Sequence, residues 1–403
     1  MVFGYLCLLG FSFILVMASD QMLICSYLNL DFFGVYLSFI TLLFVSFFIL
    51  FWRSHMSRIE GFLICVSSVF SVLCFISNDM LLFWVTYELS ILALVFCVLV
   101  GSPYSERFLA FWYLVGYVGS TSLPLLVSVL YVGVLGLSTS FVNNSANISG
   151  DFGFMWILFV ILFATKVPLP PFHSWLPVVH AEASTFVSVC LSGFIMKLGI
   201  VGIYRFVLPG FSLSAGSLVL LVVYSSLVIC SCLSELDTKR WLAYMSLGHI
   251  VVGVVGLFYG QDYVTEAPLY CLGHGFSASI LFVLFLYLYE SLGSRNWLSV
   301  SLSGRLGVAV IVILSLSLLT ASSFPPSLNF FSEVFILNMS FFNMGLVLSY
   351  SLYLFVGGLV PVLALSYLLT SSGESFGSGV STNSLLIVTV MYGVFAYLVV
   401  FFV

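Results

Sequence analysis

Long apolar stretches separated by short polar breaks run along almost the whole 403-residue chain. A helix needs about 20 mainly apolar residues to cross the roughly 30 Å hydrocarbon layer of a membrane. The strands of a membrane barrel would alternate apolar and polar residues, which runs such as 157–164 do not do. The pattern therefore predicts an all-α, multi-pass membrane protein with about thirteen spans. Their approximate limits are 2–19, 32–52, 61–77, 80–100, 108–135, 152–179, 185–207, 213–234, 241–259, 268–289, 306–340, 345–370 and 385–402.

Prolines interrupt two of the predicted spans, because proline lacks the backbone N–H that a helix needs. The sixth span contains Pro168, Pro170 and Pro171, and the eleventh contains Pro325 and Pro326. Irregular backbone at membrane depth is tolerated only where protein buries it or a wet cavity adjoins it, and paired broken helices mark the sites of secondary transporters. The alternative is that these prolines simply mark turns between shorter helices.

The composition agrees with a lipid solvent and excludes two classes of protein. Only 6% of the residues are charged and 62% are hydrophobic, whereas a soluble domain has about 25% charged residues. So few charges cannot cover the surface of a soluble globule of this length. The ten basic residues are scattered and the net charge is −5, so the sequence has no footprint for nucleic acid either.

Metal and cofactor sites are not expected in this chain. Its nine cysteines form no C-x-x-C pair. His173 and His180 are seven residues apart across prolines, unlike the close histidine spacing of helical zinc sites. The glycine-rich loops G-x-G-x-x-G and G-x-x-x-x-G-K-[ST], which hold nucleotides, are also missing from the sequence.

Basic residues in the connections between spans predict the orientation of the chain. Connections after odd-numbered spans contain one basic residue, Arg205, while those after even-numbered spans contain seven. By the positive-inside rule the N-terminus lies on the cytoplasmic or matrix side, and thirteen spans place the C-terminus opposite. No connection exceeds about 17 residues, so the function is expected within the membrane. The seven basic residues are Arg53, Arg58, Arg107, Lys239, Arg240, Arg295 and Arg305.

A small group of charged and titratable side chains falls inside the predicted spans, where an ammonium group costs on the order of 3 kcal/mol or more. Lys197 lies midway along span seven, Lys166 ends the helix before the first break, and Glu88 lies about 12 Å deep. Such groups, linked by waters and hydroxyls, can pass protons. The predicted proton relay consists of Glu88, Lys166, Lys197, Lys239, His249, His274 and Glu333.

Some members of this group also have plainer interpretations. His274 taken alone is more typical of a hydrogen bond between helices, and Lys239 of a topology charge at the membrane interface. For Glu88, Lys166 and Lys197 together, a purely structural role is disfavoured. An ion pair in lipid is costly and is easily replaced by apolar packing.

The order of these residues suggests an internal repeat. Glu88 and His249 are 161 residues apart, and Lys166 and Glu333, both at broken spans, are 167 residues apart. A shift of five spans would invert one half relative to the other, as in secondary transporters. We therefore predict one transmembrane domain, 1–403, with a first inverted repeat at about 61–207, a second at about 213–370 and a C-terminal helix at 385–402.

The segment that begins at the first break carries a family signature. Residues 166–184 read K-V-P-L-P-P-F-H-S-W-L-P-V-V-H-A-E-A-S. This resembles the signature K-x-P-x-x-x-x-H-x-W-L-P-x-A-H-x-E-A-P of the antiporter-like subunits of respiratory complex I, from which Val179 and Ser184 depart. The family includes complex I subunits 2, 4 and 5 and the multisubunit cation/proton antiporters. The matching loop residues are His173, Trp175, Pro177, His180 and Glu182.

Further blocks that resemble this family follow in the family's order, at 84–88, 196–199, 237–249, 273–275 and 325–333. The resemblance implies that Glu88 and Lys166 form a coupled pair and that Lys197 is the central proton carrier. The short chain and a glutamate at position 333 favour the subunit 4 pattern over subunits 2 and 5. The links that the resemblance implies toward Glu333, as exit group, are Lys239, His249 and His274.

The resemblance also implies a function, partners and a location. It implies a proton-translocating subunit of a complex that transfers electrons from NADH to ubiquinone in other subunits. NADH, FMN, iron–sulfur clusters and ubiquinone are expected in that wider complex, and no cofactor in this chain. Expected partners are subunits 2 and 5, membrane lipids and a respiratory supercomplex.

The heavy use of Phe, Val and Ser is typical of an organelle-encoded gene. We therefore expect a mitochondrial inner membrane, with the N-terminus in the matrix and the C-terminus in the intermembrane space. Three alternative interpretations stay open: an Mrp-type Na⁺/H⁺ antiporter subunit, complex I subunit 2 or 5, and a membrane scaffold whose buried charges only fix the register of the helices.

Overall fold

The computed structural model describes residues 22–51, 56–135, 139–141, 153–259, 266–297, 308–370 and 383–398. These residues are mostly helical, as predicted, and among them nine helices are long and apolar enough to cross a membrane. Three shorter apolar helices lie at 154–166, 309–321 and 386–397. The first predicted span, 2–19, lies outside the described residues, so the total of thirteen spans stays a prediction.

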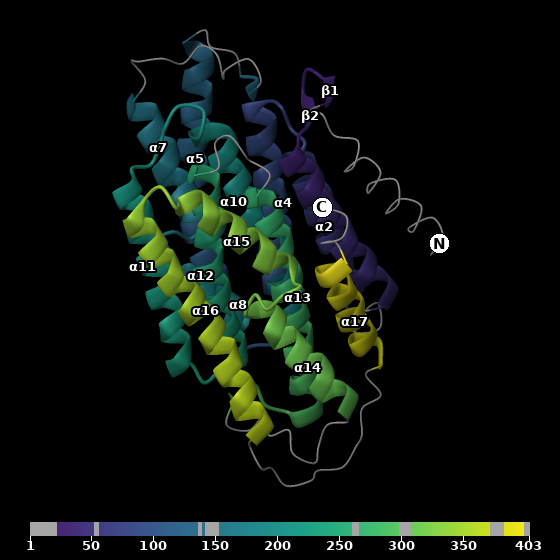
Figure 1. Ribbon diagram of the computed structural model, residues 1–403. Coiled ribbons are helices and arrows are strands. Elements are labelled where there is room, and N and C mark those ends of the chain that lie inside the picture. The colour runs from purple at the N-terminus through teal and green to yellow at the C-terminus, as the bar shows by residue number, and fades with distance from the viewer. Residues whose placement is uncertain are drawn as a thin grey trace. The chain divides into compact units, whose positions relative to one another are not determined.

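The helices form two compact units that divide between Leu213 and Ser214, and Figure 1 labels their elements. The start of α13, up to Pro268, clusters with the first unit. The first unit contains β1 (Met22–Cys25), β2 (Leu28–Leu30), α2 (Phe32–Phe51), α3 (Arg58–Phe75), α4 (Met80–Gly101), α5 (Arg107–Val134), α7 (Gly153–Lys166), α8 (Trp175–Glu182), α9 (Thr185–Cys190), η1 (Leu191–Ile195), α10 (Met196–Gly202) and η2 (Ile203–Val207). The second unit contains α11 (Ala215–Ser231), η3 (Cys232–Ser234), α12 (Thr238–Tyr259), α13 (Glu266–Leu292), α14 (Val308–Ala321), α15 (Leu328–Ser340), α16 (Met344–Thr370) and α17 (Asn383–Leu398).

Polar residues at the ends of the apolar stretches determine where several helices begin. Ser57 accepts a hydrogen bond from the Glu60 N–H while the Glu60 carboxylate accepts one from the Ser57 N–H, a capping box that begins α3. The Asp79 carboxylate accepts from the Leu81 N–H at 3.2 Å and begins α4. Ser327 caps α15 in the same way. These caps satisfy backbone donors that lipid cannot.

A short antiparallel hairpin, β1 and β2, departs from the all-α prediction. Its stabilising hydrogen bonds come from the connection between α3 and α4. The Asn29 N–H donates to the Ile76 carbonyl at 2.8 Å, and the Asn78 N–H donates to the Tyr27 carbonyl at 2.7 Å. Because these partners lie some 50 residues further along the chain, local hydropathy does not predict the hairpin.

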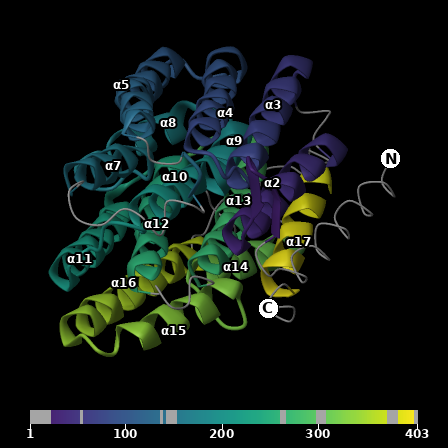
Figure 2. The same cartoon turned by 90° about the horizontal axis from the view of Figure 1, so that it is seen from above.

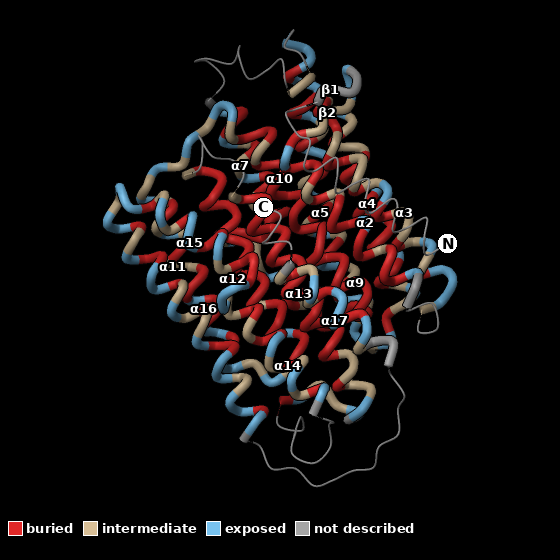
Figure 3. Tube along the Cα trace, turned by 45° about the vertical axis from the view of Figure 1, so that its right-hand side comes forward, coloured by how far each residue is buried: buried red, intermediate tan, exposed pale blue. Residues whose placement is uncertain are grey.

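The helices differ strongly in burial. Every residue in 185–207 except Tyr204 is buried. In the apolar windows of α12 and α13, 94% of the residues are buried, whereas only 33% are buried in that of α16. Figure 3 shows this contrast, with red along α10, α12 and α13 and pale blue along α11 and α16. Titratable side chains on the buried helices are therefore kept away from lipid, where they would be most costly.

In the first unit, α4 packs between α3 and α5, an arrangement that Figure 2 shows from above. Helix α10 packs against α7 at close range because two glycines leave room for it. A Cβ atom on Gly202 would lie 2.0 Å from Cε1 of Phe163, and one on Gly199 would lie 3.2 Å from the carbonyl carbon of Lys166. The first helix break is therefore held directly against the helix that carries Lys197.

We expect Gly202→Ala to destabilise the protein by about 1–3 kcal/mol, because the added methyl group would overpack the Phe163 ring. Gly116→Ala on α5 is a matched control, since nothing lies within 4 Å of a Cβ atom there and alanine favours a helix over glycine. Thermal unfolding of the purified protein should show a lower midpoint for Gly202→Ala only. A midpoint lowered equally in both variants would contradict the role of close packing.

Candidate functional site

The first helix break directly follows Lys166, the last residue of α7. Helix resumes at Trp175, where α8 begins, and the indole N–H of Trp175 donates to the Thr165 carbonyl at 3.2 Å. This bond ties the far end of the loop back to the helix that it left, so the irregular backbone has a fixed position. Of the loop prolines, Pro168 is buried, Pro170 is half-buried and Pro171 is exposed, and Pro177 is buried in the first turn of α8.

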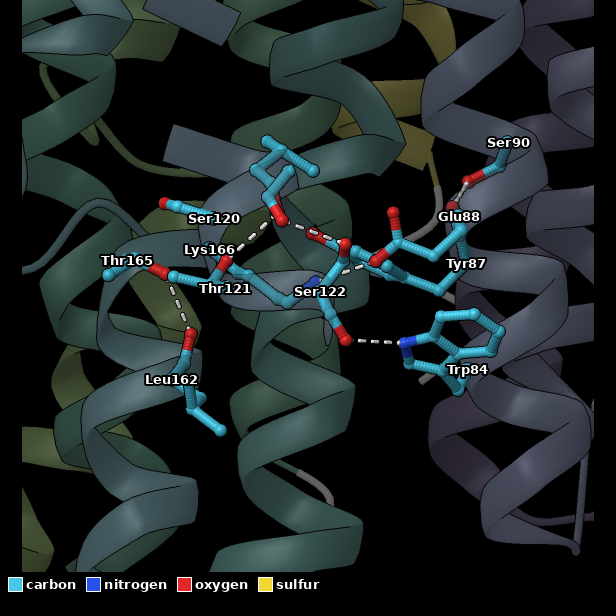
Figure 4. A network of polar contacts seen from close by, with 12 residues as sticks. Trp84, Tyr87, Glu88, Ser90, Ser120, Thr121, Ser122, Leu162, Thr165 and Lys166 are labelled. Atoms are coloured by element: carbon cyan, nitrogen blue, oxygen red, sulfur yellow. Dashed lines mark hydrogen bonds and ion pairs between the residues drawn. The ribbon is translucent and has the colours of Figure 1, made fainter. Parts of the chain in front are cut away.

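Lys166 and Glu88 form an ion pair across two helices, α7 and α4. Nζ of Lys166 lies 3.1 Å from Oε1 of Glu88, and the lysine side chain is fully buried while 23% of the glutamate side chain is exposed. Figure 4 shows Lys166 reaching from its helix toward Glu88. Because the pair lies where the dielectric constant is low, removing one partner would leave a charge without compensation.

Tyr87 completes the surroundings of the Lys166 ammonium group. Nζ of Lys166 lies 3.8 Å from the centre of the Tyr87 ring, and Tyr87 is buried. A cation over the face of an aromatic ring is attracted by the negative charge density of that face. Two consecutive residues of α4 therefore hold the ammonium group, one by its carboxylate and one by its ring.

Helix α5 fixes the helix of Glu88 and the loop after Lys166 relative to each other. The indole N–H of Trp84, one turn before Glu88, donates to the Ser122 carbonyl at 2.9 Å (Figure 4). Tyr117, also on α5, has its hydroxyl 2.9 Å from the hydroxyl of Ser174, which lies in the loop after Lys166. Both partners of the ion pair are thus positioned by contacts with α5.

Lys197 is fully buried in the first turn of α10, and α10 directly follows a π-helical turn, η1. Its Nζ donates to the Ser192 carbonyl inside that turn. A second π-helical turn, η2, follows α10. Such turns occur mostly as single insertions in α-helices, frequently at functional sites. Hydropathy predicted the span but not its two π-helical turns.

The other residues of the signature loop lie beside the first break. His180 is buried on α8, and its carbonyl accepts from the Ser188 hydroxyl at 3.4 Å. The Glu182 carbonyl accepts from the Ser102 hydroxyl at the end of α4. His173 and Glu182 are half-buried. These contacts connect α8 to both α4 and α9.

The second unit contains the second break, between α14 and α15, where Pro325 and Pro326 are exposed. Glu333 lies on α15 and is buried. The Tyr353 hydroxyl of α16 donates to Oε1 of Glu333 at 3.4 Å and also hydrogen-bonds with Nδ1 of His249 on α12. The sequence-predicted His249 and Glu333 are therefore joined through a residue that was not predicted.

Tyr270 of α13 completes this second cluster. Its hydroxyl lies 3.3 Å from Nδ1 of His249 and 3.2 Å from the Tyr353 hydroxyl. All four side chains are buried. We call His249, Tyr270, Glu333 and Tyr353 the His249–Glu333 cluster. It joins four helices of the second unit, α12, α13, α15 and α16.

His274 lies next to this cluster, with its ring centre 5.9 Å from that of His249. Both histidines line a small cavity of about 10 Å³ together with Ser246 and Ser277. Lys239 is buried in the first turn of α12, where its N–H donates to the Asp237 carboxylate at 3.0 Å. Among the described residues, no group of three His, Cys, Asp or Glu side chains is arranged to hold a metal ion.

Three tyrosines in these clusters were missed by the sequence analysis: Tyr87, Tyr270 and Tyr353. The chain has 21 tyrosines, so residue type alone does not distinguish these three. Only Tyr87 carries a usable signal, since it directly precedes Glu88. Tyr270 and Tyr353 are 83 residues apart and meet only in the folded chain.

Arg205, which the sequence assigned to an odd-numbered connection, lies in η2 and forms a second buried ion pair. Its Nη2 lies 3.1 Å from both carboxylate oxygens of Asp31, and both residues are buried. The guanidinium also donates to the carbonyls of Phe75 and Ser77 at the end of α3. The exception to the orientation bias is therefore a neutralised charge that connects η2, α2 and α3.

Comparison with known proteins relates this arrangement to a family. The family described as "NADH:quinone oxidoreductase/Mrp antiporter, TM" matches residues 77–359. The NADH-ubiquinone oxidoreductase chain 4 of Branchiostoma lanceolatum is 32% identical over 309 residues, which cover 70% of this chain and 67% of that protein. The chain of the same name from Metridium senile is 31% identical over 335 residues, which cover 75% of this chain and 66% of that protein. The chain thus spans about two thirds of the length of these relatives.

Two solved structures share the fold. A chain of the respiratory complex I from Thermus thermophilus with bound NADH has a TM-score of 0.81 at 21% identity, covering 96% of this chain and 90% of that one. A chain of the Mrp complex from Dietzia sp. DQ12-45-1b has a TM-score of 0.80 at 18% identity, covering 94% and 77%. At these identities the likeness concerns the fold alone.

Proposed function

The chain belongs to the NADH:quinone oxidoreductase/Mrp antiporter family of membrane proteins, and we propose that it is a proton-translocating membrane subunit of a respiratory NADH:ubiquinone oxidoreductase. The family resemblance inferred from the signature loop is confirmed by the family match and by relatives named chain 4 of that enzyme. The observation that carries the proposal is the Lys166–Glu88 ion pair at a helix break inside the membrane. Titratable groups in such places mark ion and proton pathways.

In this proposal Glu88 and Lys166 act as a coupled pair and Lys197 as the central carrier. A charge that arrives near Glu88 weakens its attraction for Lys166, whose ammonium group then releases a proton toward Lys197. Both lysines are buried in the first unit, and α10 packs directly against the end of α7, which supports this order. The onward groups in the second unit are Lys239, His249, His274 and, as exit group, Glu333.

Electron transfer takes place in other subunits in this proposal. NADH, FMN, the iron–sulfur clusters and ubiquinone would belong to them, as the family resemblance implies. Its contribution to NADH:ubiquinone reduction would be to link that reaction to proton movement. The partners would include subunits 2 and 5, membrane lipids and a respiratory supercomplex.

The finer architecture is also proposed. Thirteen spans would form one transmembrane domain made of inverted repeats at about 61–207 and 213–370. The division of the helices at Leu213 and Ser214 supports these limits, as does the presence of one helix break in each unit. In an inner mitochondrial membrane, this count would place the N-terminus in the matrix and the C-terminus in the intermembrane space.

A second candidate function is a subunit of an Mrp-type Na⁺/H⁺ antiporter. The TM-scores of 0.81 and 0.80 favour neither solved structure, since both share the fold of this chain. Relatives above 30% identity over most of the chain, named chain 4 of the oxidoreductase, favour the first function. The two functions differ in the driving reaction, because only the first requires NADH oxidation.

We expect Lys197→Met to reduce NADH-driven proton uptake by about tenfold in vesicles that contain the whole complex, because methionine fills the space but carries no proton. Leu198→Met is the matched control, since Leu198 is equally buried and leucine and methionine exchange with little loss of packing. Normal proton uptake in Lys197→Met would contradict the proposed function. Sodium-dependent proton exchange without NADH would favour the antiporter instead.

A further inference from the structure

The four residues of the His249–Glu333 cluster form a continuous hydrogen-bonded connection across the second unit. Tyr353 lies at its centre, since its hydroxyl contacts Nδ1 of His249, the Tyr270 hydroxyl at 3.2 Å and Oε1 of Glu333 at 3.4 Å. A hydroxyl offers one proton and accepts two hydrogen bonds. Tyr353 can therefore accept from His249 and Tyr270 while it donates to Glu333, which uses its full capacity.

Resting on the proposed function, we propose that the Tyr353 hydroxyl carries protons directly from His249 to Glu333 and that Tyr270 positions it. The family motifs contain His249 and Glu333 but no residue between them. The proposal adds Tyr353 as the group that transfers the proton from one to the other. The connection is short and enclosed by protein, since all four side chains are buried. Among the described residues, the proton would therefore pass from His249 to Glu333 through the Tyr353 side chain.

The step is balanced in protons and charge. The Nδ1–H bond of a protonated His249 breaks as its proton passes to the Tyr353 oxygen. The O–H bond that Tyr353 held before breaks at the same time, and its proton forms a new O–H bond on the Glu333 carboxylate. The imidazolium and the carboxylate both become neutral and the tyrosine is unchanged. Two rearrangements prepare the next transfer, after Glu333 has released its proton. The Tyr353 hydroxyl rotates back toward Glu333, and the remaining proton of His249 returns from Nε2 to Nδ1, which frees Nε2 to accept the next proton.

The opposite side of the His249 ring provides an entry for the proton. Nε2 of His249 is buried and has no hydrogen-bond partner among the described residues. His249 also lines the cavity of about 10 Å³ that it shares with Ser246, His274 and Ser277. That volume is about the size needed for one water molecule, and its lining offers polar partners. An imidazole can receive a proton at one nitrogen and release one from the other.

Tyr270 has the geometry of a positioning residue. Its hydroxyl contacts both Nδ1 of His249 and the Tyr353 hydroxyl, while no contact of that hydroxyl with Glu333 is made in the described cluster. It therefore holds the donor and the carrier at a fixed separation. Removing its hydroxyl leaves the contact between Tyr353 and Glu333 in place.

Tyr350 shows that a buried tyrosine on α16 need not take part in such a connection. It lies one turn before Tyr353, with the two ring centres 5.5 Å apart, and it is buried to the same extent. Its hydroxyl has no hydrogen-bond partner among the described residues. Tyr350→Phe is therefore a matched control for removing a buried hydroxyl from this helix.

The test compares Tyr353→Phe, Tyr270→Phe and Tyr350→Phe in vesicles that contain the whole complex. We expect NADH-driven proton uptake to fall about fivefold in Tyr353→Phe, about twofold in Tyr270→Phe and not at all in Tyr350→Phe. Electron transfer from NADH to a soluble artificial acceptor should be equal in all three. The effect of replacing H₂O by D₂O on proton uptake should also change in Tyr353→Phe, which a purely structural loss would not cause.

The result for Lys197→Met distinguishes the two proposals. If Lys197→Met loses proton uptake while Tyr353→Phe keeps it, the relay through Tyr353 is wrong and the proposed function stands. If both variants keep it, the proposed function fails and the relay fails with it. An equal loss in Tyr353→Phe and Tyr350→Phe would also overturn the relay, because it would indicate damage to packing.

Discussion

Replacing Glu88 by glutamine is expected to lower NADH-driven proton uptake by about a hundredfold. The Nζ atom of Lys166 would lose the carboxylate that lies 3.1 Å away, although the side chain stays fully buried. Breaking a buried ion pair by removing one partner costs about 3–5 kcal/mol, and about 1.4 kcal/mol corresponds to each factor of ten. Lys166 would then no longer hold its proton in the resting state, so the proposed relay would lack its first donor.

Glu60→Gln is the matched control for this loss. Glu60 is another buried glutamate of the first unit, but it belongs to the capping box of α3. Glutamine can replace glutamate in such a box, so proton uptake should stay close to that of the unchanged protein. Proton uptake and NADH oxidation measured on the same vesicles would separate a defect in the relay from poor assembly.

A double variant separates a relay from a purely structural pair. Glu88→Gln combined with Lys166→Met removes both charges and keeps side chains of similar size. If the pair only stabilises the fold, the double variant should recover proton uptake, because neither charge of this pair is left without its partner. We expect it to recover the amount of assembled complex but not proton uptake. Recovery of both would contradict the role of Glu88 and Lys166 in the relay.

The sequence predicted the helices well because one physical requirement decides them. A backbone in lipid must satisfy its own hydrogen bonds, so long apolar runs have to be helical. Pro168, Pro170 and Pro171 interrupt one helix, and Pro325 and Pro326 another, for the same local reason. The beginnings of α3 and α4 are equally local, since Ser57 and Asp79 supply the caps.

The rest of the candidate site depends on contacts between distant parts of the chain. Glu88 and Lys166 are 78 residues apart, and His249 and Tyr353 are 104 apart. The lysines, glutamates and histidines were still predicted as candidates, because a charge or an imidazole is unusual inside an apolar run. Tyrosine is not unusual there, so the sequence carries no signal for Tyr353. Its role is visible only where α12, α15 and α16 meet.

Arg205→Ala is expected to destabilise the protein by about 3–5 kcal/mol and to remove most of the assembled complex from the membrane. The variant would leave the Asp31 carboxylate buried without the guanidinium that contacts both of its oxygens at 3.1 Å. It would also free the carbonyls of Phe75 and Ser77, which Arg205 binds at the end of α3. Quantitative detection of the complex in membranes, with thermal unfolding of what remains, would measure the effect.

Arg295→Ala is the matched control. Arg295 forms an ion pair with Asp237, and both of these side chains are about a quarter exposed. At a separation of 3.7 Å and with partly exposed side chains, such a pair contributes about 1 kcal/mol or less. Asp31→Asn combined with Arg205→Met should recover part of the loss, since it removes both buried charges together. Equal effects of Arg205→Ala and Arg295→Ala would contradict this explanation. Such a result would mean that the burial of Arg205 does not explain its contribution to stability. The presence of a basic residue on the side of the membrane that is otherwise poor in them would then need another explanation.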